Sequence, residues 1–191
     1  GQPALEQPVE LSIPGTHAVE NALAASACAL AAGASLEQIA AGLGLVSAIA
    51  GRLEFKPLAN NSAVIDDSYN ASPSSFRAAI DVLANRAGRK ILVMGDMAEL
   101  GEDSINMHSE VGAYALEAGI DALYAVGEQS ASACAAFGGN HFQSRELLAT
   151  AVAQELSRAS ADNRPVTFLV KGSRSAGMEK IVEHLITRGN T

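Results

Sequence analysis

The hydrophobic pattern from residue 63 onward alternates between short apolar runs and longer stretches with helical spacing. The short runs have the length and apolar character of buried strands, and the stretches between them predict helices. This alternation predicts an α/β fold, a Rossmann-like, doubly wound and mostly parallel sheet with helices on both faces. The expected strands are 63–66, 90–94, 122–126, 141–143 and 166–170, and the expected helices are 73–85, 104–118, 128–137, 145–159 and 176–188.

The first fifty residues follow a different pattern. Apolar residues alternate at 9–13, which predicts either an irregular lead-in or an edge strand. An alanine-rich helix is expected over 17–32, and a second helix starts with the capping-box sequence at 35–38. The expected units are a helical pair over 1–50 and a sheet domain over 51–191, with the boundary within 45–51.

The composition supports a folded α/β domain and argues against several other classes of protein. The chain has 191 residues, of which 48% are hydrophobic and 4% aromatic, and it contains no Trp. This suits helices packed closely on a sheet better than an aromatic β-sandwich. A net charge of −8 without a long basic run argues against nucleic acid or an anionic membrane as the main partner.

The number of cysteines and the length of the apolar segments indicate in which cellular compartment the protein is expected. Cys28 and Cys134 are too few for a disulfide framework and lack the paired spacing of a metal site, so we expect two buried thiols and no metal site. No stretch reaches the roughly 18 apolar residues of a membrane helix, and the polar start lacks the regions of a signal peptide. We therefore expect a cytoplasmic protein.

A polar stretch, Asp-Asp-Ser-Tyr-Asn at 66–70, follows the first expected strand of the sheet domain. Ligands of doubly wound sheets bind at the carboxyl ends of the strands. Ser72 and Pro73 are expected to start the next helix just beyond this turn, so that its free N–H groups face an anion or a ribose. The alternative is an ordinary turn in which the side chains of Asp66, Asp67 and Asn70 hydrogen-bond to nearby backbone.

A second loop, Gly-Asp-Met-Ala-Glu-Leu-Gly at 95–101, follows the next expected strand. The carboxylates of Asp96 and Glu99 are suited to binding an ammonium group or orienting a water. The alternative is an acidic turn that favours the dipole of the following helix. We expect His108, in that helix, to be a surface or core residue rather than a catalyst.

A third loop follows the last expected strand. Lys171, Ser173 and Arg174 bring two cations and a hydroxyl to the expected start of a helix, a combination suited to a carboxylate or a phosphate. A solvated basic turn is the alternative.

Several stretches resemble motifs of the Mur ligase family and occur in the family's order. They are 14–25, 50–54, 66–73, 95–101 and 171–179, and they extend over nearly the whole chain. In the first stretch His17 and Asn21 match the family pattern, but Ala18 stands where an Asn is expected. The loop at 95–101 is similar to the branch of the family that adds D-alanyl-D-alanine.

The resemblance implies roles for particular residues. Asn21 would help to hold adenine, Arg52 would reach the nucleotide, and Asp67 would bind ribose hydroxyls. Tyr69 and Asn70 would line the same cleft. The residues implied for the amino substrate are Asp96, Glu99, Lys171, Ser173 and Arg174, the last three for its carboxylate.

The resemblance also implies the reaction. ATP, with Mg²⁺, would phosphorylate the carboxylate of UDP-N-acetylmuramoyl-tripeptide, and the amine of D-alanyl-D-alanine would attack the acyl phosphate. No Gly-x-x-x-x-Gly-Lys-Ser/Thr sequence occurs, so we expect the phosphate-cradling loop, the magnesium ligands and a complete catalytic set to lie in the rest of the same enzyme. The chain would be the tail of a central ATP-binding domain followed by a C-terminal domain, inactive alone. The alternatives are a non-catalytic nucleotide-binding module and a sibling ligase with another amino substrate.

Overall fold

The computed structural model describes residues 6–13, 15–46 and 49–189. The chain divides into two compact units, Gly1–Ile49 and Ala50–Thr191. Several positions of the sequence predictions lie outside the described residues: Pro14 of the first motif, residues 47 and 48 of the expected boundary, and residues 1–5 of the lead-in.

The first unit contains two helices, α1 (Thr16–Ala31) and α2 (Leu36–Gly44). Ser35 caps α2 with the predicted capping box, since its Oγ accepts from the backbone N–H of Gln38 and the Gln38 side chain accepts in return. The described part of the lead-in, 6–13, is irregular rather than a strand. Cys28 is exposed, so the prediction of a buried thiol is wrong there, because the described residues of its unit form no sheet on which α1 could pack.

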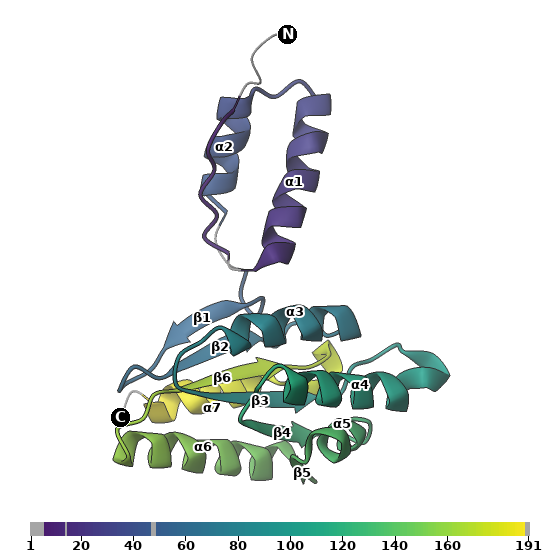
Figure 1. Cartoon of the computed structure of the whole chain (residues 1–191), viewed down its shortest axis with the longest axis vertical. Helices are drawn as coiled ribbons and strands as arrows, with labels where there is room; N and C mark the ends of the chain where they lie inside the picture. Colours follow the sequence, from purple (N-terminus) through teal and green to yellow (C-terminus); the bar gives the residue numbers. More distant parts are fainter. Residues whose placement is uncertain (1–5, 14, 47–48, 190–191) are drawn as a thin grey trace. The chain divides into compact units, whose positions relative to one another are not determined.

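The second unit is built on a six-stranded sheet with the strand order β1-β2-β6-β3-β4-β5 (Figure 1). Only β1 is antiparallel to its neighbour, and the other neighbouring pairs are parallel. The predicted mostly parallel α/β fold is thereby confirmed. The elements are β1 (Glu54–Pro57), β2 (Ala63–Asp67), α3 (Pro73–Ala84), β3 (Arg89–Gly95), η1 (Gly101–Asp103), α4 (Ser104–Glu117), β4 (Ala122–Val126), α5 (Ser130–Phe137), β5 (Asn140–Phe142), α6 (Arg145–Ala161), β6 (Val166–Lys171), η2 (Arg174–Ala176) and α7 (Glu179–Gly189).

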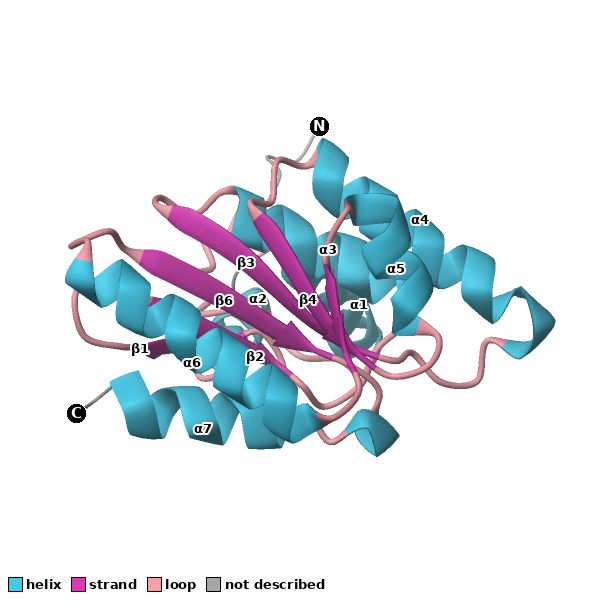
Figure 2. Cartoon of the chain, turned by 90° about the horizontal axis from the view of Figure 1, so that it is seen from below, coloured by secondary structure: helices cyan, strands magenta, loops and turns pink. Residues whose placement is uncertain are grey.

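Helices cover both faces of this sheet (Figure 2). Alternate residues of each strand point to opposite faces, so Ile65 of β2 packs in the core beneath α3, α4 and α5. Its neighbour Val64 packs in the second core, beneath α6 and α7. Because both faces are buried, the strands are continuous apolar runs, which is the pattern that the sequence shows.

Two helix starts in the sheet unit differ from the predictions. The last helix, α7, begins at Glu179 rather than at residue 176, because Gly177 has a φ of 61° and separates it from the short turn η2. Helix α5 begins at Ser130 rather than at residue 128. The start of α3 is as predicted: Pro73 is its first residue, and the Oγ of Ser72 accepts from the N–H of Ser75.

None of the described helices combines the length and the apolar character that crossing a membrane requires.

Candidate functional site

The loops that the sequence singled out lie at one edge of the sheet. Strands β2, β6, β3 and β4 are consecutive neighbours and run parallel, so their carboxyl ends lie together. The loop after β6 is tied to the loop after β3, because the N–H of Ser173 donates to the carbonyl of Asp96 at 2.8 Å. Residues far apart in the sequence are thus held at a common edge.

Asp67 and Lys171, the last residues of β2 and β6, form a buried ion pair. They are register partners, and their exposed fractions are 8% and 2%. The ammonium of Lys171 donates to Asp67 Oδ2 and, at 3.0 Å, to the carbonyl of Asn70. Asp67 Oδ1 accepts from the N–H of Leu53 at 3.1 Å. The pair therefore holds the loop after β2 and the start of the sheet unit against the end of β6.

Burial and the ion pair shift the pKa of Lys171 in opposite directions. Burial lowers the pKa of this lysine, and the Asp67 carboxylate opposes that shift. The family resemblance predicts that Asp67 binds a ribose and that Lys171 binds a substrate carboxylate. In the structure the two side chains form an ion pair with each other. Those assignments stay predictions.

Two arginines lie against the ring of Tyr69. The guanidinium carbon of Arg52 is 4.7 Å from the ring centroid and that of Arg174 is 5.7 Å from it. Both distances fall within the range of cation–π contacts. The tyrosine is 45% exposed, so these two positive charges are gathered at an accessible ring. An anion such as a phosphate suits this cluster, since a guanidinium binds oxyanions with fixed donors.

The cluster joins residues that the sequence had assigned to different ligands. Arg52 and Tyr69 were predicted for the nucleotide, and Arg174 was predicted for the amino substrate. Asn70 follows Tyr69, and its side-chain oxygen accepts from the N–H of Ala71 at 2.9 Å, as in the ordinary-turn alternative.

Asp96 follows β3 and accepts hydrogen bonds at the start of α5. Its carboxylate accepts from the backbone N–H of Ser130 at 2.8 Å and from the hydroxyl of the same serine. Gly127, with a φ of 119°, leaves room for this carboxylate, because a Cβ at that position would overlap it. Asp96 is therefore positioned by the chain after β4, a segment at the expected ligand-facing edge in which the sequence predicts no site residue.

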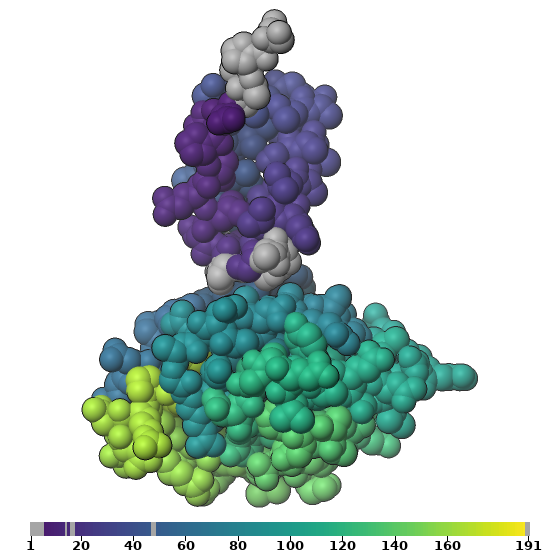
Figure 3. Space-filling view, in the orientation of Figure 1, coloured from purple at the N-terminus to yellow at the C-terminus, as the bar shows by residue number. Residues whose placement is uncertain are grey.

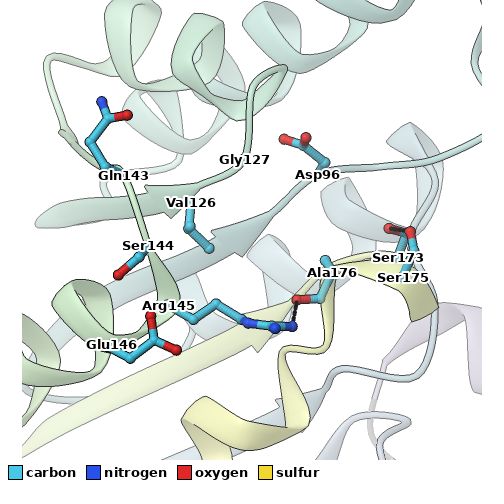
Figure 4. Close-up of a pocket in the computed structure, with 10 residues that line it drawn as sticks. All are labelled: Asp96, Val126, Gly127, Gln143, Ser144, Arg145, Glu146, Ser173, Ser175 and Ala176. Atoms are coloured by element: carbon cyan, nitrogen blue, oxygen red, sulfur yellow. Dashed lines mark hydrogen bonds between the residues drawn. The ribbon is translucent and has the colours of Figure 1, made fainter.

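Asp96 and Ser173 line an open pocket of about 440 Å³ (Figure 4). Arg145, the first residue of α6, reaches into it from the opposite side and donates from Nη1 to the carbonyl of Ala176 at 2.9 Å. The pocket also holds Glu146, whose pKa is lowered mainly by a hydrogen bond from Ser144. The remaining lining residues are Val126, Gly127, Gln143, Ser144, Ser175 and Ala176.

Other predicted residues lie outside this pocket. Glu99 is exposed with a φ of 62°, and the segment that follows it, η1 and the start of α4, projects from the surface of the sheet unit (Figure 3). Asn21 is exposed on α1, in the helical unit.

His108 is a core residue, one of the two settings expected for it. It is fully buried, its Nε2 accepts from the N–H of Met97 at 2.9 Å, and its Nδ1 donates to the carbonyl of Ser104 at 2.7 Å. The imidazole therefore fixes the loop after β3 onto α4.

The chain was compared with known proteins. Residues 51–174 match the family model described as "Mur ligase, glutamate ligase domain". The UDP-N-acetylmuramoyl-tripeptide–D-alanyl-D-alanine ligase of Escherichia coli is 46% identical over 182 residues, which are 95% of this chain and 39% of that protein. The protein of the same name from Haemophilus influenzae is 38% identical over 93% of this chain and 39% of its own length.

A solved crystal structure is similar to this chain over nearly its whole length. A crystal structure of MurF from Acinetobacter baumannii superposes with a TM-score of 0.85 at 37% identity, covering 94% of this chain and 39% of that one. The chain thus spans about two fifths of the length of the relatives it matches.

Proposed function

Because the chain belongs to the Mur ligase family, we propose that it is part of an ATP-dependent ligase that joins D-alanyl-D-alanine to UDP-N-acetylmuramoyl-tripeptide in peptidoglycan precursor synthesis. The observation that carries the proposal is the 46% identity with a ligase of that name over 95% of the chain. A cytoplasmic location accords with this role.

The reaction that we propose has two steps. The terminal phosphoryl group of ATP passes to the tripeptide carboxylate, which gives an acyl phosphate and ADP. The amine of the dipeptide then attacks the acyl carbon, phosphate leaves, and the amine proton is released as the amide forms. Such a ligase needs a nucleotide site next to an amine site, and we propose that this chain contributes to each.

The cluster of Arg52, Tyr69 and Arg174 is our candidate for contact with the nucleotide. Its two guanidinium groups at an exposed ring favour an anionic ligand. Asp67 stays a proposed ribose contact, because an ionised carboxylate accepts hydrogen bonds from hydroxyl groups. Asn21, on α1 of the helical unit, stays a proposed contact for adenine.

The pocket between Asp96, Ser173 and Arg145 is our candidate for the dipeptide. It offers a carboxylate, hydroxyl groups and a guanidinium, as a zwitterionic ligand requires. Lys171 would act on this site indirectly, because direct contact would require its ammonium to leave Asp67. Glu99 is exposed beside this edge and stays a proposed contact.

The proposed reaction also uses Mg²⁺ with ATP. Across the described residues, no group of three or more His, Cys, Asp or Glu side chains is arranged to hold a metal ion. We propose that Mg²⁺ is bound mainly by the part of the enzyme outside this chain.

NMR titration of the 191-residue chain tests the proposal. D-alanyl-D-alanine should give saturable shifts around Asp96, Ser173 and Arg145, whereas L-alanyl-L-alanine should give weaker ones. ATP with magnesium should shift signals around Tyr69 weakly, because only part of its site would be present.

The same titration separates the two alternatives. Tight nucleotide binding with no response to the dipeptide would favour a non-catalytic nucleotide-binding module. A stronger response to D-glutamate or L-alanine than to the dipeptide would identify a sibling ligase, an outcome worth testing because the family model is described as a glutamate ligase domain.

A further inference from the structure

We infer that Arg145 binds the C-terminal carboxylate of the amino substrate and selects for a free carboxylate at that end. The inference rests on the proposed function, because it takes the pocket at the end of β3, β4 and β6 as the dipeptide site. Arg145 belongs to none of the motifs that resemble the Mur ligase family, and the fold alone places it in the pocket.

Among the cations that the structure describes near this edge, Arg145 is the one that lines the pocket. The ammonium of Lys171 is 2% exposed and is bound by Asp67 and the carbonyl of Asn70. Arg174 lies on the ring of Tyr69, outside the pocket. Arg145 is partly buried and lines the pocket, and the one acceptor recorded for it among the described residues is the carbonyl of Ala176. A guanidinium has five N–H donors, so a carboxylate can still be bound by the others.

The position of Arg145 is held by backbone. Its Nη1 donates to the carbonyl of Ala176 at 2.9 Å, which orients the guanidinium across the pocket (Figure 4). Gly177 makes this possible, because a Cβ at that residue would overlap Nη1. An arginine fixed in this way loses less side-chain entropy when it binds a planar carboxylate than a mobile lysine would.

Two features favour a ligand carboxylate at Arg145, although the carboxylates of Asp96 and Glu146 also line the pocket. Arg145 is the first residue of α6, which has 17 residues, so the positive end of the helix dipole adds to its charge. The hydroxyl groups of Ser173 and Ser175 also line the pocket, with their oxygens 3.1 Å apart, so one can donate to the other while the second donates to a ligand.

A carboxylate site at Arg145 fixes which way the dipeptide lies in the pocket. Ser173 lines the pocket, and the next residue, Arg174, belongs to the cluster with Tyr69 that we assign to the nucleotide. With its carboxylate at Arg145, the dipeptide would extend its amine along the loop after β6 towards the nucleotide, where the acyl phosphate would form. The amine nitrogen, whose electron pair attacks the acyl carbon, would then lie at the end of the dipeptide that is nearer the acyl phosphate.

The test pairs a change in the protein with a change in the ligand. Arg145→Gln removes the charge and keeps a donor, and D-alanyl-D-alaninamide replaces the ligand carboxylate by an amide. Arg164→Gln is the matched control, because Arg164 is exposed and precedes the amino end of β6, at the opposite edge of the sheet. Binding is measured by NMR titration of the 191-residue chain, and the dispersion of the spectra verifies that each variant is folded.

The original chain should bind the free dipeptide about tenfold more tightly than the amide, as a charge-assisted pair in an open pocket predicts. Arg145→Gln should weaken binding of the free dipeptide about tenfold and leave binding of the amide almost unchanged, so that the preference disappears. Arg164→Gln should keep the preference, and Arg145→Lys should retain part of it, because the charge remains and the planar fork is lost.

Two results would overturn the inference in different ways. If the original chain binds the dipeptide and Arg145→Gln still prefers the free carboxylate tenfold, another group binds that carboxylate and only the inference fails. If the original chain binds neither the dipeptide nor the amide, the proposed dipeptide site fails and the inference with it.

Discussion

Replacing Lys171 by Met tests how much the buried ion pair stabilises the sheet unit. The substitution keeps an unbranched side chain beside Phe76, whose ring centroid is 5.5 Å from the lysine Nζ. It removes the ammonium that neutralises Asp67 and the donor to the carbonyl of Asn70. The perturbation is therefore mainly electrostatic.

The expected cost can be bounded from the geometry. Removing one partner of a buried pair costs about 3 to 5 kcal/mol. Asp67 keeps the hydrogen bond from the N–H of Leu53, so the lower end, about 3 kcal/mol, applies. In the double variant Lys171→Met with Asp67→Asn, the amide oxygen can still accept from Leu53 and no charge is buried. That variant should recover about 2 kcal/mol of the loss.

Urea unfolding followed through the amide NMR signals of β2 and β6 measures this effect in the sheet unit alone. The chain has no Trp, so intrinsic tryptophan fluorescence is not an option. The reasoning would be refuted if the double variant were as unstable as Lys171→Met, because the loss would then come from packing around Phe76 and not from the charge on Asp67.

Three further changes test other parts of the structure. His108→Leu should cost about 2 to 3 kcal/mol, since the buried N–H of Met97 loses its acceptor, and amide hydrogen exchange at Met97 should accelerate; unchanged exchange there would contradict this role. Gly112→Ala should lower the thermal midpoint and cost about 2 kcal/mol, because a Cβ on α4 would overlap the carbonyl of Ala133 on α5; an unchanged midpoint would show that the helices separate freely. Burial raises the pKa of the Cys134 thiol to about 11 from 9.0, so the folded state keeps a proton that the unfolded chain releases, and stability should fall as pH rises from 9.0 to about 11. Urea unfolding across this range should show a shallower decline for Cys134→Ala than for the original chain, and equal declines would contradict the assignment to this thiol.

The bounds of helices and strands could be predicted where interactions between residues close in sequence determine them. Strand β4, Ala122–Val126, has the predicted bounds, because it is a short apolar run between turns. Helix α3 begins at Pro73 as predicted, since a serine cap and a proline at the first position act within a few residues. The start of α7 was wrong because the left-handed conformation of Gly177 ends η2, and a glycine alone does not specify its φ.

The candidate site was predictable only in part. The sequence identified the loops after β2, β3 and β6, because polar residues after apolar runs mark strand ends in a doubly wound sheet. It did not identify Arg145, which is the first residue of a long helix after a short strand and belongs to no recognisable motif. The signal that could have pointed to it is its place at the start of a helix that follows a strand of the same sheet.

The sequence by itself determined the alternation of strands and helices, the α/β class and the family resemblance, because hydrophobic spacing, caps and turn residues act over short distances. The tertiary structure decided which side chains meet. Asp67 and Lys171 are 104 residues apart and become partners only because β6 lies beside β2. The pocket likewise needs Asp96, Arg145 and Ser173 from separate loops, brought together by the order of parallel strands. Strand order depends on long-range packing of the whole sheet, which no local pattern of residues specifies.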